Sequence, residues 1–190
     1  MDNKQKYISA VTSLNRPGIG KYLEWLEETD FYTAPASTKP SYHGCYPGGL
    51  LQHSLNVMVI ACDLWQVCNK RLKNVNCTKE SVLLCAALHD VCKINTYKPC
   101  TWKGHEKEYV VVDENYPLVG HGEKSLVKAL QLGIDLNNDE MEAIRWHMGW
   151  FDSGAREYPS TYNFNTASKK PLVKIIQTAD MLACLMDQEV

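Results

Sequence analysis

Ser81-Val-Leu-Leu-Cys-Ala-Ala-Leu-His-Asp90 is the stretch of sequence that decides the fold of this chain. Its first eight residues are mostly apolar and follow Thr78, a favourable N-cap, so they predict a buried helix that ends near His89 and Asp90. An ionised carboxylate at the end of a buried helix loses its hydration, which costs free energy. A bound cation would offset that cost, because imidazole and carboxylate are both good ligands for divalent metals.

Four more residues lie in comparable helical settings. His53 follows two glycines at a predicted helix start, and His121 lies at another start, where unpaired N–H groups favour anions. His147 lies one turn from a predicted helix end. Asp180 falls in mid-helix, where an unpaired carboxylate is difficult to explain. We therefore predict one metal site assembled from five helical segments.

Two histidines and the eight cysteines are not expected to bind metal. His43 and His105 lie in polar loops and lack a helical setting. The cysteines show no C-x-x-C spacing, and Cys62, Cys85 and Cys184 fall among apolar neighbours, where a free thiol behaves as a small hydrophobe. Most cysteines are therefore expected to be reduced core residues.

The composition limits the partners of the protein. The chain has 190 residues and a formal net charge of -2, which gives no electrostatic case for an obligatory nucleic-acid partner. It lacks both an apolar run of the roughly 18 residues that a membrane span needs and the apolar core of a signal peptide. We expect no membrane association and a cytoplasmic location. The oligomeric state stays open, with a homo-oligomer among the alternatives.

The hydrophobic periodicity predicts one mostly α-helical domain over residues 1–190. Residues 1–47 form an N-terminal helix and a loop that pack on the core, and residues 48–190 form the metal-binding core. Strand-forming residues followed by a polar turn predict a small inserted β-hairpin near 107–118. Helices are expected over 16–28, 49–72, 78–90, 120–132, 137–149 and 170–187, with an irregular polar and aromatic loop over 151–168.

The order His53, His89-Asp90 and Asp180 resembles the H…HD…D signature of the HD superfamily of metal-dependent phosphohydrolases. The additional His121 and His147 resemble the larger ligand set of the two-metal members. This resemblance implies an HD-domain helical bundle in which the first four residues hold one metal. Asp90 would bridge to a second metal held by His121 and His147.

Two further stretches refine the resemblance. Residues 31–38 together with 48–54 resemble a bacterial and prophage subgroup related to HD-type exonucleases. His89-Asp90-Val-Cys-Lys93 resembles the HD-x-x-K pattern of phosphodiesterase-like members, although Cys92 replaces a common glycine. Gln52 replaces a frequent glutamate before His53, which argues against a proton-transfer role at that position.

The resemblance implies hydrolysis of a phosphodiester or a nucleotide phosphate. Asp90 and Lys93 would be catalytic, and the substrate would be a small phosphorylated molecule such as a nucleotide or an oligonucleotide end. The ligand types suit Mn, Fe, Co, Ni or Zn equally. Alternatives are a di-iron oxygenase and a non-catalytic, metal-stabilised nucleotide-binding module. The expected substrate-binding cations are Lys93, Lys124, Arg145 and Arg156.

Aromatic residues gather after His147 and in the inserted segment. Ordinary packing is one interpretation of this group. The other is that the loop over 146–162 and the hairpin line a pocket and stack a nucleobase. The residues concerned are Trp102, Trp146, Trp150, Phe151, Tyr158 and Tyr162.

Overall fold

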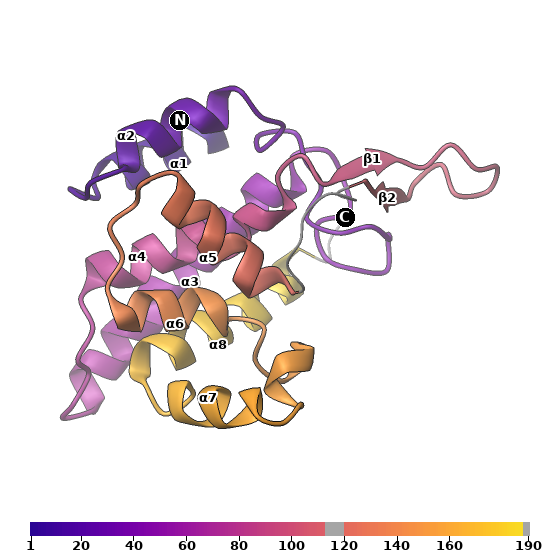
Figure 1. Ribbon diagram of the computed structural model, residues 1–190. Coiled ribbons are helices and arrows are strands. Elements are labelled where there is room, and N and C mark those ends of the chain that lie inside the picture. The colour runs from indigo at the N-terminus through magenta and orange to yellow at the C-terminus, as the bar shows by residue number, and fades with distance from the viewer. Residues whose placement is uncertain (113–119, 188–190) are drawn as a thin grey trace.

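The protein folds as a bundle of helices from which one hairpin projects (Figure 1). A computed structural model describes residues 1–112 and 120–187. The mostly α-helical fold with a small hairpin is therefore confirmed. The described helices are α1 (Asn3–Thr12), α2 (Ile19–Glu27), α3 (Gly49–Arg71), α4 (Lys79–Leu88), α5 (His121–Gln131), α6 (Asn138–Arg145), α7 (Ser160–Ala167) and α8 (Pro171–Met186), with short 3-10 helices η1 (Val91–Lys93), η2 (Gly149–Phe151) and η3 (Ser153–Ala155).

Helix α3 forms the centre of the bundle and packs against α4 and α8, while α6 packs against α5 and α8. The core between these helices contains fully buried aliphatic side chains, such as Leu50 and Val57 on α3, Leu84 on α4 and Ile176 on α8. Burial of such side chains supplies the main driving force for folding. The packing of these side chains also fixes the positions of the helix ends. Several residues with metal-binding chemistry lie near these ends.

Local capping explains where two of the core helices begin. The Thr78 hydroxyl accepts a hydrogen bond from Ser81 N at 3.0 Å, as the sequence predicts for the start of α4. Asn137 caps α6 by accepting from Glu140 N, and the Glu140 carboxylate accepts in return from Asn137 N. These reciprocal bonds form a capping box, which satisfies N–H groups that have no partner within the helix.

The inserted hairpin is present, but its strands differ from the expected ones. Strand β2 (Tyr109–Val111) pairs antiparallel with the preceding β1 (Tyr97–Pro99), with Lys98 opposite Val110. The partner strand was missed because three residues carry too little alternation to be recognised. The turn expected at 113–115 lies outside the described residues.

Two helices were not predicted from the sequence. Helix α1 buries only Tyr7 and Val11, and α7, in the segment predicted to be irregular, buries only Phe164 and Ala167. Such short apolar faces give a weak helical period. Tertiary contacts hold α1 in place: the Tyr7 hydroxyl hydrogen-bonds to the Tyr22 hydroxyl at 2.7 Å and donates to Ala87 O at 3.0 Å.

Within residues 1–112 and 120–187, every helix is too short or too polar to cross a lipid bilayer.

A buried ion pair fastens the N-terminal segment to α6. The guanidinium of Arg16 contacts both carboxylate oxygens of Glu140 at 3.0 Å, and Glu140 is completely buried. Substituting Arg16→Ala leaves this carboxylate without its counter-charge, so we expect a loss of about 2–3 kcal/mol in the free energy of unfolding by urea titration. Lys4→Ala, which removes an exposed pair with Glu27, is the control and should leave the midpoint unchanged. Equal effects of the two substitutions would contradict this interpretation.

Candidate metal centre

Three elements bring four buried metal-binding side chains together. His53 lies on the second turn of α3, His89 and Asp90 follow α4, and Asp180 lies on α8. His53 Nε2 is 3.2 Å from both His89 Nε2 and Asp180 Oδ1. Asp90 Oδ2 is 3.6 Å from His53 Nε2 and 3.5 Å from His89 Nε2. The donor atoms of the sequence-predicted first ligand set therefore converge.

The spacing of these donors fits a common cation. Metal–ligand bonds of about 2.1 Å place neighbouring ligand atoms roughly 3.0–3.4 Å apart. The nitrogen–oxygen and nitrogen–nitrogen separations in the cluster run from 3.2 Å to 3.9 Å. Direct pairing of His53 with Asp180 satisfies part of the cluster. Asp90 Oδ1, however, is buried and has no hydrogen-bond partner in the described part of the chain.

A second group of donors lies on the other side of Asp90. His147, two residues after α6, places its buried Nε2 atom 3.6 Å from Asp90 Oδ1, and no described residue forms a hydrogen bond with this nitrogen. His121, the first residue of α5, has a donor atom within 4.8 Å of donors on Asp90 and Cys92. Two buried polar atoms without partners cost free energy unless a ligand satisfies them, so these residues fit a cation.

The imidazole rings are oriented by bonds to their second nitrogen. His89 Nδ1 is 2.8 Å from Ala86 O, and His147 Nδ1 is 2.8 Å from Ile144 O. His53 Nδ1 instead contacts the carboxylate of Asp187 at 2.6 Å. A proton on each Nδ1 leaves Nε2 with a free lone pair directed into the cluster, which is the usual arrangement of metal-binding histidines.

Charge pairing keeps the buried groups ionised. Burial alone would raise the pKa of Asp90, but the Lys93 ammonium at 2.7 Å and His89 hold it well below its usual range. Burial would lower the pKa of Lys93, and the Asp90 carboxylate raises it instead. Asp180 has a lowered pKa because hydrogen bonding to His53 outweighs burial. Both carboxylates and the Lys93 ammonium therefore stay ionised at neutral pH.

The histidines divide into two electrostatic groups. Burial would lower the pKa of His53, but contacts with Asp180 and Asp187 raise it to about 9. His147 also has a raised pKa, because its contact with Asp90 outweighs burial. Burial lowers the pKa of His121 to about 4, with the Lys93 charge acting in the same direction. His121 is therefore neutral near pH 7, as a metal ligand must be.

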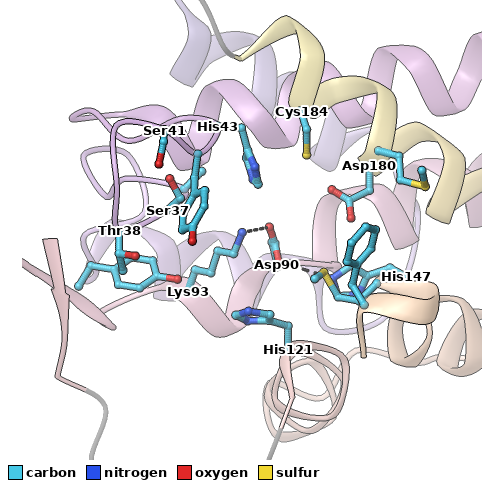
Figure 2. A pocket seen from close by; sticks show the side chains of 16 residues that line it. Ser37, Thr38, Ser41, His43, Asp90, Lys93, His121, His147, Asp180 and Cys184 are labelled. Atoms are coloured by element: carbon cyan, nitrogen blue, oxygen red, sulfur yellow. Dashed lines mark ion pairs between the residues drawn. The ribbon is translucent and has the colours of Figure 1, made fainter. Parts of the chain in front are cut away.

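Four of the six predicted metal ligands line a pocket of about 550 Å³ (Figure 2), namely Asp90, His121, His147 and Asp180. Lys93 points into the same space beside Asp90. Ser37, Thr38 and Ser41, from the segment before α3, lie together on one side of the pocket. The remaining lining residues are Ala36, Tyr42, His43, Tyr97, Met148, Phe151, Met181 and Cys184.

A known protein family matches the part of the chain that carries these residues. A family model described as "HD domain" matches residues 50–185, which include all six predicted metal ligands and Lys93. The chain belongs to the HD domain family. The assignment to the HD superfamily of metal-dependent phosphohydrolases, expected from the H…HD…D order, is therefore confirmed. Neither the search of curated proteins nor the search of solved structures found a significant match.

Three of the four cations predicted to bind substrate lie outside the residues that line the pocket. Lys124 lies in the first turn of α5, and Arg156 is an exposed residue after η3. Arg145 forms ion pairs with Glu123 and Asp152 and stacks on the Trp146 ring, with its guanidinium carbon 3.8 Å from the ring centroid. Its guanidinium thus joins α5, α6 and the segment after η2. Lys93 is the predicted cation that reaches the pocket.

Of the six aromatic residues considered above, Trp146 is buried and the other five are exposed. Trp146 and Trp150 both contact Phe164, with ring centroids at 5.4 Å and 5.0 Å. Phe151 differs from the other exposed rings because it lines the pocket. Tyr158 contacts Tyr162 at the surface, and Trp102 is exposed on the hairpin. Pocket lining by the 146–162 segment thus comes from His147, Met148 and Phe151.

Three residues at the site were missed in the sequence. Asp187 lies just past α8 and contacts His53, yet its position near the end of the sequence gave no signal. His43 lies in a polar loop and lines the pocket. Cys184 was expected in the core, but it also lines the pocket. Because Cys184 lies one turn after Asp180 on α8, the helical spacing could have predicted that both residues face the same site.

The contact between Asp187 and His53 gives a test of ligand positioning. Substituting Asp187→Asn weakens the acceptor that orients the His53 ring, so we expect metal affinity to fall about 10- to 100-fold. Competition with a chromogenic chelator measures this affinity directly. Asp63→Asn, which changes an exposed carboxylate on α3, is the matched control. Unchanged metal affinity in a correctly folded Asp187→Asn protein would exclude the positioning role.

Proposed function

We propose that the protein is a phosphohydrolase that cleaves a phosphodiester or a nucleotide phosphate at a binuclear His/Asp metal site. The observation that carries this proposal is the pair of buried atoms Asp90 Oδ1 and His147 Nε2, which lie 3.6 Å apart beside the pocket and have no hydrogen-bond partner within residues 1–112 and 120–187. An apolar pair would suffice for packing at this position. A cation explains why both groups are kept.

The donor set supports two metal positions that share Asp90. His53, His89, Asp90 and Asp180 would hold the first cation, and Asp90, His121 and His147 would hold the second. Nitrogen and oxygen donors of this kind accept Mn, Fe, Co, Ni or Zn. Such cations, when bound, lower the pKa of a coordinated water and stabilise negative charge on a phosphate.

The pocket walls favour a nucleotide or an oligonucleotide end as substrate. The Lys93 ammonium lies beside Asp90, where it would neutralise charge on a phosphate oxygen. The hydroxyls of the lining residues Ser37, Thr38 and Tyr97 offer hydrogen bonds to sugar or phosphate oxygens. The exposed ring of Phe151, which also lines the pocket, offers an apolar face on which a base can stack.

The shared ligand provides the first test of this function. Asp90→Ala removes a carboxylate from both proposed metal positions, so we expect loss of bound metal and of turnover together. Metal content is measured by elemental analysis after dialysis. Turnover is measured as p-nitrophenol release from bis(p-nitrophenyl) phosphate and as phosphate release from a panel of nucleotides, with each metal added back.

The surface substitution Asp63→Ala should leave metal content and turnover at wild-type levels. Turnover that survives in Asp90→Ala would refute the proposed mechanism. Iron-dependent oxygen uptake without phosphate release would support a di-iron oxygenase instead. Tight nucleotide binding without turnover across all the metals would support a binding module.

Lys93 gives a second and separate test. Lys93→Met keeps the length of the side chain but removes the ammonium that faces the pocket, so we expect turnover to fall about 10²- to 10³-fold. Steady-state kinetics on the best substrate of the panel measures this loss. Lys98→Met on β1 is the control, because Lys98 is exposed and does not line the pocket. Wild-type kinetics in Lys93→Met would exclude a role in charge stabilisation.

A further inference from the structure

His43 occupies a position that the proposed metal chemistry does not use. It belongs to the segment between α2 and α3, whereas the six proposed ligands lie on or beside the helices of the bundle. Figure 2 shows its ring directed into the pocket from the side opposite His121, near Cys184 and above Lys93 and Asp90. Its surroundings therefore combine the proposed metal centre with the open space of the pocket.

The backbone around His43 is tied down on two sides. Gly44 O accepts a hydrogen bond from Ala36 N at 2.8 Å, and Gly44 N donates to Asp187 O at 3.4 Å. Gly44 has a φ of +60°, and a Cβ atom there would lie 2.7 Å from the Ala36 Cβ, so a side chain at this position would be strained. The His43 ring also packs on His53, with centroids 4.7 Å apart. The imidazole is therefore held in place before any ligand binds.

The Nε2 atom of His43 is buried and has no hydrogen-bond partner among the described residues. Leaving a buried polar atom unsatisfied costs free energy, so such an atom in a pocket wall indicates a ligand. His53, His89 and His147 each lie within 3.6 Å of a carboxylate oxygen. In the described part of the chain, no carboxylate oxygen lies within 4.0 Å of His43, which separates it from these three proposed ligands.

We propose that His43 is a substrate-binding residue whose Nε2–H donates a hydrogen bond to an oxygen of the phosphate held over the metal centre. This inference rests on the proposed phosphohydrolase function. His43 and Lys93 would then contact the phosphate with different donors, an imidazole from the loop before α3 and an ammonium from η1. The ligand class is a phosphate ester, and inorganic phosphate is its simplest probe.

Two amide substitutions distinguish this role from packing. A glutamine amide reaches the position of Nε2, whereas an asparagine amide reaches only that of Nδ1. We expect His43→Ala and His43→Asn to lower kcat/KM and the affinity for inorganic phosphate about tenfold or more, as for loss of a hydrogen bond to a charged group. His43→Gln should restore both to within about threefold of the wild type. Phosphate affinity is measured by calorimetry on the metal-loaded protein.

Metal content and a matched histidine provide the controls. All three His43 variants should keep the wild-type metal content, and His105→Gln, at an exposed histidine of the hairpin, should behave as the wild type. Loss of metal in the variants would overturn the proposal in favour of a ligand role, for which His43, His53 and Cys184 have donors within 4.8 Å of one another. If His43→Gln, His43→Asn and His43→Ala are equally impaired, the His43 ring contributes packing alone, and the proposal fails.

The two proposals can fail separately. If the wild-type protein binds inorganic phosphate but hydrolyses no ester, the proposed function fails, and the phosphate affinities of the three variants still decide the role of His43. If the wild type hydrolyses an ester and all three variants match it in kcat/KM and phosphate affinity, the role of His43 fails and the proposed function stands.

Discussion

The burial of two carboxylates, Asp90 and Asp180, among imidazole rings is the constraint on which the rest of the structure depends. Taking these charges out of water is unfavourable, so the fold must provide compensating partners. It does so by packing α3, α4 and α8 against one another, so that the end of α4 meets both other helices. The aliphatic core can thus be understood as the frame that holds three helix segments at metal-binding distance.

Much of this frame could be predicted because its signals are local. A long apolar period marks α3, and the caps Thr78 and Asn137 mark the starts of α4 and α6. The polar residues His53, His89-Asp90 and Asp180 stand out because each interrupts such a period. That these residues converge is a property of the tertiary structure. It could be predicted because a single bound cation would explain all of the interruptions.

The remaining features depend on contacts that no local pattern encodes. Helix α1 is held by the Tyr7 hydroxyl, which reaches Tyr22 and Ala87 across the bundle. Arg145 has the chemistry of a phosphate-binding residue, yet its guanidinium is engaged by Glu123 and Asp152. The sequence identifies which residues carry a charge, whereas the packing of neighbouring helices decides whether that charge faces a pocket or a structural partner.

Asp187 links the metal centre to the wall of the pocket. Its carboxylate accepts from Asn56 and contacts His53 Nδ1, while its backbone oxygen accepts from Gly44, the residue after His43. One residue at the end of α8 therefore fixes both a proposed metal ligand and the loop that carries the proposed phosphate contact. Because both connections come from the same residue, a shift of the α8 end would move the His53 ring and the His43 loop together. Asp187 thus couples the geometry of the proposed metal centre to that of the proposed phosphate contact.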